Sequence, residues 1–224
     1  MKLSIVIPVL NEAAGIEAAL QALAPLRARG VEVVVVDGGS SDATADLVRP
    51  FADRVLSAPR GRAMQMNAGA AAATGDLLLF LHVDTRLPES ADRIVRDGLQ
   101  RHLWGRFDVR FDSGGWLSLV ALAMNTRSRL TGIATGDQAM FMTRAAFEQA
   151  GGFPAIALME DVALSARLKR LGPPLCLATR VTTAGRRWQQ RGVLRTILLM
   201  WQLRLRYFLG ADPARLARAY GYDH

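Results

Sequence analysis

The chain has 224 residues and a net charge of +8, half of its residues are hydrophobic, and about a fifth are charged. This composition predicts a globular domain with a substantial core and excludes a low-complexity chain. Cys176 is the only cysteine, which excludes an intrachain disulfide and a cysteine-rich zinc site. A single cysteine suits a reducing compartment, so we expect a cytoplasmic protein.

The positive charge is concentrated near the C-terminus. From Arg180 onward the chain has nine arginines and two aspartates, a local excess of +7. Such a segment favours an anionic partner, namely nucleotide phosphates, lipid headgroups or nucleic acid. The alternative is a general preference for arginine, because lysine occurs only at positions 2 and 169. At the N-terminus, the apolar stretch within residues 1–12 is too short for a signal peptide, and this segment predicts a first strand.

Apolar runs that alternate with helical patterns predict the elements of the first half of the chain. We expect strands at 3–9, 31–36, 54–57 and 76–82, and helices at 13–26, 43–50, 62–73 and 88–102. The second half is less regular, with strands expected near 106–111, 138–143 and 178–183 and helices near 116–130, 160–171 and 192–209. This order is typical of an α/β domain whose mostly parallel central sheet is flanked by helices. The continuous run Val33–Val36 fits a strand buried on both faces.

Polar side chains follow three of the predicted strands at the points where the strands end. Asn11 and Glu12 follow the first strand, Asp37 closes the second, and His82 and Asp84 follow the fourth. In open α/β sheets, ligands bind outside the carboxyl ends of the strands. The sequence therefore predicts a binding site at this edge of the sheet.

Asp37 ends a run of four valines, where a carboxylate is costly unless it has a partner. A nucleotide base or ribose is one such partner. Gly38 and Gly39 permit a tight turn after it, and Asp42 can cap the helix that follows. The stretch is not a Gly-x-Gly-x-x-Gly loop, which disfavours a dinucleotide fold of that type.

His82 and Asp84 lie two residues apart, on the same side of an extended chain. A carboxylate suits Mg²⁺ or Mn²⁺, and a nucleotide diphosphate usually supplies further ligands. The alternative is that Asp84 only caps the turn before Pro88.

Two further pairs of charged residues could carry chemistry. Arg60 and Arg62 precede a helix of small residues and could meet a diphosphate or a base, although each taken alone fits a solvated surface residue better. Glu160 and Asp161 open a predicted helix, where acidic residues are favoured by the helix dipole. The functional alternative for this second pair is a general base facing an acceptor hydroxyl.

Four stretches together resemble a known family. SIVIPVLNE at 4–12, DGGSSDAT at 37–44, HVD at 82–84 and MED at 159–161 are similar, in order and spacing, to family 2 glycosyltransferases with a GT-A fold. The resemblance covers roughly residues 3–175. More narrowly, the chain resembles a small bacterial branch that has HxD where most relatives have DxD.

The resemblance implies a metal-dependent, inverting enzyme of hexosyltransferase type that moves a sugar from a nucleotide-diphosphate donor to an acceptor hydroxyl. It implies Asp161 as the catalytic base with Glu160 beside it, and Asp84 as the ligand of Mn²⁺ or Mg²⁺. The residues implied to bind the nucleotide are Pro8, Asn11, Glu12, Asp37, Arg60, Arg62 and His82.

Several assignments stay open beside the resemblance. His82 stands where most relatives have the first Asp of their pair, which leaves the identity of the donor uncertain. Asp137 could bind an acceptor hydroxyl or cap a turn. Arg186, Arg187 and Trp188 resemble the end of a QxxRW motif without its glutamine, and could contact the diphosphate or the acceptor.

The expected C-terminal helix raises the question of membrane contact. Its longest uncharged run, Thr196–Leu203, is far shorter than the roughly 20 residues that span a bilayer. Arg195, Gln202 and Arg206 share one stripe, whereas Arg204 falls on the apolar side, where it could reach lipid phosphates. The alternative is packing on the domain or on a second copy in a homodimer.

These observations divide the chain into a glycosyltransferase domain over residues 1–185 and a basic helical extension over 186–224, packed on the domain or on a membrane surface. The expected partners are a nucleotide-diphospho-sugar donor and a hydroxyl acceptor, with a lipid-linked acceptor as one option. The competing hypotheses are a non-catalytic nucleotide-sugar-binding protein and a basic membrane- or nucleic-acid-binding protein. We expect no nucleic acid partner, because the aromatic residues of the apolar C-terminal helix suit packing better than base stacking. A nucleotidyltransferase is disfavoured because no Gly-rich basic loop follows the first strand.

Overall fold

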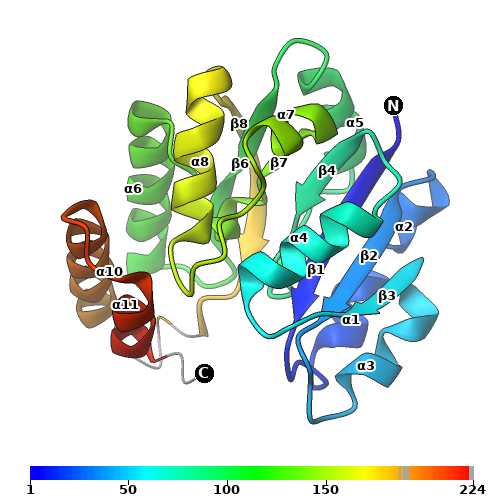
Figure 1. The fold of residues 1–224 in the computed structure, drawn as a ribbon, viewed down its shortest axis with the longest axis horizontal. Coiled ribbons are helices and arrows are strands. Elements are labelled where there is room, and N and C mark those ends of the chain that lie inside the picture. Colours follow the sequence, from blue (N-terminus) through cyan, green and yellow to red (C-terminus); the bar gives the residue numbers. More distant parts are fainter. Residues whose placement is uncertain (187, 189–191, 222–224) are drawn as a thin grey trace.

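An eight-stranded mixed sheet forms the centre of the molecule (Figure 1). The computed structural model describes residues 1–186, 188 and 192–221. The strands are β1 (Leu3–Val9), β2 (Glu32–Asp37), β3 (Arg54–Ser57), β4 (Leu77–Phe80), β5 (Thr85–Arg86), β6 (Trp104–Phe111), β7 (Phe141–Thr143) and β8 (Leu175–Thr183). Their order across the sheet is β3-β2-β1-β4-β7-β6-β8-β5. β1 to β4 are mutually parallel, whereas β7 and β5 run antiparallel to their neighbours.

Helices cover both faces of this sheet. They are α1 (Ile16–Gln21), α2 (Ala24–Ala28), α3 (Thr44–Leu47), α4 (Arg62–Ala72), α5 (Ala91–Gly98), α6 (Trp116–Thr131), α7 (Arg144–Gln149), α8 (Glu160–Leu171), α10 (Val193–Phe208) and α11 (Pro213–Tyr220). Two short 3₁₀ turns, η1 (Arg49–Phe51) and η2 (Gly136–Gln138), complete the described elements. The predicted α/β architecture, with a mostly parallel sheet between helices and a C-terminal helix, is confirmed.

The sheet separates two hydrophobic cores, because side chains along each strand point alternately to its two faces. Ile5 of β1 and Val33 of β2 point to the face covered by α1, α2, α5 and α6. Val6 and Val34 point to the opposite face, covered by α4, α7 and α8. Successive side chains of a strand point to opposite faces, so β2 can be buried along its whole length.

The small residues of α4 let this helix approach the sheet closely. A Cβ atom on Gly69 would lie 2.4 Å from a methyl carbon of Val6 and 2.9 Å from one of Val36. α4 therefore lies directly across β1 and β2, as Figure 1 shows. This contact fixes the start of α4 beside the carboxyl ends of the same strands.

Several predicted boundaries were wrong in ways that affect the site. The helix expected at 13–26 is two helices, because Pro25, in the first turn of α2, cannot donate a hydrogen bond to the preceding turn. β4 ends at Phe80 and not at residue 82. Residues 81–84 therefore lie outside the strand and connect its carboxyl end to β5, which pairs with β8. β5, α7 and α11 lacked a signal strong enough to predict.

The C-terminal helices pack on the segment that leads into α8. Leu203 of α10 and Leu216 of α11 form a buried cluster with Leu158, Met159 and Val162. Figure 1 shows α10 and α11 beside α6, at the end of the molecule away from β3. Over residues 1–186, 188 and 192–221, no helix has both the length and the apolarity needed to cross a bilayer.

Candidate active site

A cavity of about 1250 Å³ opens at the carboxyl ends of β1 and β4 and extends between α6, α8 and α10. Ten of the residues singled out from the sequence line it: Pro8, Glu12, Arg60, Arg62, His82, Asp84, Asp137, Glu160, Asp161 and Trp188. Asn11, Asp37 and Arg186 are not among its lining residues. Arg187 lies outside the described residues. The fold therefore gathers most of the predicted site from segments spread over 180 residues of sequence.

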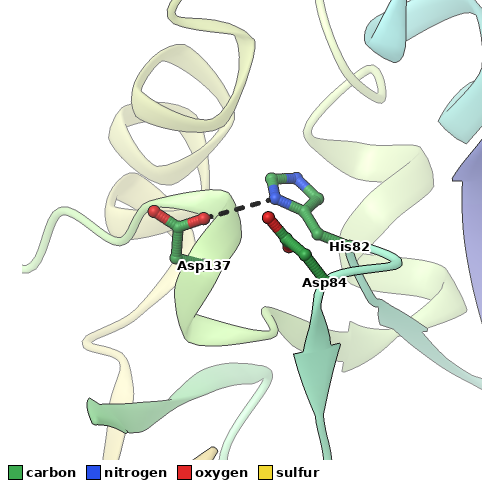
Figure 2. Close-up of side chains that lie close together, drawn as sticks. All are labelled: His82, Asp84 and Asp137. Carbon is green, nitrogen blue, oxygen red and sulfur yellow. Dashed lines mark ion pairs between the residues drawn. The ribbon is translucent and has the colours of Figure 1, made fainter. Parts of the chain in front are cut away.

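Three possible metal ligands meet in this cavity. His82 and Asp84 come from the segment after β4, and Asp137 comes from η2. One ligand atom of each lies within 4.8 Å of the other two, and His82 Nδ1 is 3.5 Å from Asp137 Oδ1. Figure 2 shows the carboxylate of Asp137 facing the imidazole, with Asp84 beside it. The sequence analysis assigned Asp84 alone to the metal and placed Asp137 near the acceptor.

The chemistry of these donors fits a divalent cation. One imidazole nitrogen and two carboxylates suit Mn²⁺, whereas Mg²⁺ prefers oxygen ligands throughout. His82, Asp84 and Asp137 together therefore fit Mn²⁺ better than Mg²⁺.

Gly136 connects the metal-ligand group to Asp161. Its backbone N–H donates to Asp161 Oδ2 at 2.8 Å, while Asp161 Oδ1 accepts from the N–H of Val162 at 2.7 Å. The His82 ring lies against the same glycine, since a Cβ there would be 2.2 Å from His82 Cε1. Gly136 was not among the predicted site residues, although it directly precedes Asp137, which was.

Glu160 and Asp161 are adjacent but differ in environment. Glu160 is 3% exposed, and Nη1 of Arg62 lies 3.8 Å from its Oε1. Burial raises the pKa of the Glu160 carboxyl, the charge of Asp161 raises it further, and Arg62 opposes both effects. Asp161 is only partly buried and is oriented by two backbone N–H groups. Of the two carboxylates, Asp161 is thus the better placed to receive a proton.

Asp37 has its hydrogen-bond partners within its own loop. Its carboxylate accepts from the N–H groups of Gly39 and Ser40 at 3.1 and 3.0 Å, and from the Ser40 hydroxyl. Asn11, in a left-handed conformation with φ of 54°, accepts from the N–H of Ser41 at 2.8 Å. The sequence predicted that Asp37 needs a partner, and a nucleotide was one option. In the structure, the loop itself supplies that partner.

Gln65 is a site residue that the sequence analysis did not find. Its side-chain amide donates to the carbonyl groups of Val9 and Val36, at 2.8 and 2.9 Å. These bonds join the ends of β1 and β2 to α4, and Gln65 lines the cavity. The only feature of the sequence that could have indicated Gln65 is its polar side chain in a helix of mostly small and apolar residues.

A second part of the cavity is an apolar groove between α6 and α10. Its lining residues there are Trp116, Leu119, Val120, Ala123 and Met124 from α6, and Val193, Leu194, Ile197, Met200 and Trp201 from α10. Arg127 and Arg204 also line this part. The sequence left Arg204 either reaching lipid phosphates or on a helix packed on the domain. In the structure α10 packs on the domain, and the Arg204 side chain lines the cavity with its Nε buried.

Comparisons with known proteins identify the family of this chain. Residues 4–147 match the model of glycosyl transferase family 2. The chain is 27% identical to the probable glycosyltransferase YdaM of Bacillus subtilis, over 93% of this chain and 55% of that protein. It is 41% identical over 100 residues to the PGL/p-HBAD biosynthesis glycosyltransferase of Mycobacterium tuberculosis, covering 42% of this chain and 39% of that one. The chain thus spans about half the length, or less, of these curated relatives.

A solved structure shows the same fold. The mannosyltransferase PcManGT of Pyrobaculum calidifontis, in complex with GDP-Man and Mn²⁺, superimposes with a TM-score of 0.67 at 22% identity, over 98% of this chain and 69% of that one. The family match covers more than half of the chain and includes the segments that hold Pro8, Asp37, Asp84 and Asp137. This chain therefore belongs to glycosyltransferase family 2 and has the GT-A fold.

Proposed function

We propose that this protein transfers a sugar from a nucleotide-diphosphate donor to an acceptor hydroxyl, with inversion at the anomeric carbon. The observation that carries this proposal is the convergence of the His82–Asp84–Asp137 group and Asp161 in one cavity at the carboxyl ends of β1 and β4. A transferase needs a cation-binding group for a diphosphate and a proton acceptor at the same place.

The donor half of the cavity is lined by Pro8, Glu12, Arg60 and Arg62. Arginine forks suit a diphosphate, and the loop that Asp37 holds borders the same strand ends. Support for a nucleotide-sugar donor and a metal also comes from the GDP-Man and Mn²⁺ in the structurally similar mannosyltransferase. The base and the sugar of the donor are left to experiment.

His82, Asp84 and Asp137 would hold the metal ion. When bound, a divalent cation would offset the negative charge of the departing diphosphate. Trp188 lines the cavity and packs edge-on against Phe111, with ring centroids 5.7 Å apart, which makes it a candidate wall for the acceptor.

Asp161 is the proposed general base. The N–H groups of Gly136 and Val162 orient its carboxylate while leaving it able to accept one further proton. The acceptor hydroxyl transfers its proton to Asp161 as its oxygen bonds to the anomeric carbon, and the bond from that carbon to the diphosphate breaks. Attack on the side opposite the leaving group inverts the anomeric centre. Glu160, whose burial favours the protonated form, lies beside Asp161, with its Oε1 3.8 Å from Nη1 of Arg62.

Calorimetry with a panel of nucleoside diphosphates, with and without Mn²⁺, tests this function. We expect Mn²⁺-dependent binding of one nucleotide, and its loss in Asp84→Ala. Asp97→Ala, which changes an exposed aspartate on α5, is the matched control and should bind as the unchanged protein does. Failure of every nucleotide to bind in the presence of Mn²⁺ would remove the proposed function.

We also propose that the outer side of α6 and α10 contacts a membrane surface. Large apolar side chains are exposed there, at Trp116, Leu119, Leu122, Leu194, Leu198, Trp201, Leu205 and Phe208. Arg195 and Arg206 are exposed on the same helix, α10, which favours anionic lipids. Flotation with vesicles containing anionic lipid should recover the protein, and Trp201→Ser should reduce recovery. Self-association through this face without vesicle binding would contradict the membrane contact.

A further inference from the structure

Arg127 of α6 and Arg204 of α10 bury guanidinium atoms without partners. Both side chains line the cavity, and Nε and Nη2 of Arg127 and Nε of Arg204 are buried with no hydrogen bond. Among the residues that the structure describes, neither guanidinium forms an ion pair within 4.0 Å. Arginine is normally paired when it is withdrawn from water, whereas these two have no carboxylate in direct contact among the described residues.

The two cations also act on one another. Burial lowers the pKa of Arg127 to about 10, and the charge of Arg204 contributes to the shift, while Asp161 opposes it. Burial likewise lowers the pKa of Arg204, against the charges of Asp161 and Asp137. Two guanidinium groups that act on one another and have nitrogen atoms without a hydrogen bond can attract an anionic ligand. Guanidinium forks bind phosphate-type oxyanions through paired hydrogen bonds.

The groove beside these arginines is open and apolar. Trp116 and Leu119 on α6 are 74% and 57% exposed, and Leu194 and Trp201 on α10 are 75% and 73% exposed, yet all four line the cavity. Figure 1 shows α6 and α10 side by side, as these lining residues require. Apolar walls in water favour an apolar ligand chain.

We infer that Arg127 and Arg204 form a subsite for the anionic, phosphate-type group of an amphiphilic acceptor whose apolar chain lies between α6 and α10. The inference rests on the proposed function, because it assigns this ligand as the acceptor. Asp161 lies close enough to both arginines to affect them electrostatically, so a hydroxyl near the bound anion would lie near the proposed base. The arginines proposed for the donor diphosphate are different ones. Arg60 and Arg62 line the cavity just before α4 and at its first residue.

Titration calorimetry with octyl phosphate, kept below its micelle concentration, tests the subsite directly. Octyl glucoside carries the same chain without the charge, and inorganic phosphate carries the charge without the chain. We expect octyl phosphate to bind most tightly of the three. Arg127→Gln and Arg204→Gln should each weaken it by about tenfold or more, since a hydrogen bond to a charged group contributes about 1.5–3 kcal/mol.

Arg93→Gln is the matched control, because it removes an exposed arginine from α5, a helix whose residues do not line the cavity. It should leave octyl phosphate binding unchanged. Arg127→Lys keeps the charge but removes the fork, and should give an affinity between those of the unchanged protein and Arg127→Gln. A cooperative thermal transition in each variant shows that it is folded.

Four outcomes would overturn the inference. Inorganic phosphate that binds as tightly as octyl phosphate would identify a free-anion site, and octyl glucoside that binds equally well would remove the role of charge. Weaker Mn²⁺–nucleotide binding in the two glutamine variants would assign the arginines to the donor. Nucleotide binding by the unchanged protein tests the proposed function separately, so an intact nucleotide site with no octyl phosphate binding would reject only the subsite.

Discussion

The two ends of the cavity differ in how their polar groups are satisfied. At the strand ends, Asp37, Asn11 and Gln65 form hydrogen bonds within the protein that hold the loops after β1 and β2 in place. Between α6 and α10, Arg127 and Arg204 bury nitrogen atoms without partners. The loops after β1 and β2 thus have their hydrogen bonds formed before any ligand binds, whereas the two arginines have nitrogen atoms without a partner.

This difference indicates two ways of building a binding site. A loop whose hydrogen bonds are already formed loses little entropy when a ligand arrives, which favours affinity through preorganisation. Buried cations without partners lower the stability of the free protein, and a ligand that supplies the missing charge restores it. We therefore expect substitutions at the strand ends to destabilise the protein, and substitutions of the arginines to stabilise it while weakening ligand binding.

The largest effect is expected between the two ends, at Asp161. Asp161→Asn keeps the shape of the side chain but removes its capacity to take a proton. Transfer from the donor found by calorimetry should slow by about 100- to 10,000-fold, while the affinity for that nucleotide with Mn²⁺ stays within about twofold. Steady-state kinetics and calorimetry on the same preparation measure both quantities. A variant that loses nucleotide affinity as well would show that Asp161 holds the donor rather than acting as a base.

Asp37→Ala tests the preorganised end. It leaves the N–H groups of Gly39 and Ser40 without their acceptor, so we expect a loss of about 2 kcal/mol in the free energy of unfolding. For a chain of this length that corresponds to a fall in Tm of about 4–8 °C. Asp37→Asn retains an acceptor oxygen and should lose less, as measured by calorimetric unfolding. An unchanged Tm in Asp37→Ala would show that the loop does not depend on its carboxylate.

Arg127→Met tests the unsatisfied end and should have the opposite sign. Removing a buried cation that lacks a partner should stabilise the ligand-free protein by about 1 kcal/mol. Arg204→Met should do the same, and the double variant should gain less than the two single gains together, because either substitution removes their mutual repulsion. Urea unfolding of the four proteins measures this cycle. Destabilisation by either single change would mean that the guanidinium is satisfied after all.

The smallest effect is expected at Glu160 and depends on pH. Burial and the neighbouring Asp161 raise the pKa of its carboxyl above the ordinary value of 4.5. The folded protein therefore keeps this proton to a higher pH than the unfolded chain, so the group lowers stability as the pH rises above 4.5. Glu160→Gln should raise Tm at neutral pH, and this gain should shrink toward pH 4. A gain that persists unchanged at pH 4 would not come from titration of Glu160.

The sequence alone predicted much of the fold. The hydrophobic runs of β1 and β2 and the periodic helices α6 and α8 are local patterns, and local patterns are visible without tertiary information. The split of the helix expected at 13–26 was missed, although Pro25 marks it. The two-residue strand β5 was missed because its partner, β8, lies about 90 residues further along the chain.

The candidate site was predicted unevenly for a related physical reason. Asp84 and Asp161 stand in short ordered motifs that resemble those of the family, so their positions could be named in advance. The position of Asp137 beside His82, and that of Gly136 between His82 and Asp161, depends on η2 meeting the segment after β4. No spacing in the sequence encodes that contact.

What the sequence determined by itself was the set of elements, the polar residues at the strand ends and the resemblance to a family. What only the tertiary structure decided was which distant side chains share one cavity, and which of them remain unsatisfied there. Arg204 shows the difference: helical periodicity placed it on the apolar side of α10, and packing of that helix on the domain turned this side into the cavity beside Arg127. A hydrophobic pattern specifies that a face will be buried, but the partner that buries it is a long-range contact that one segment cannot specify.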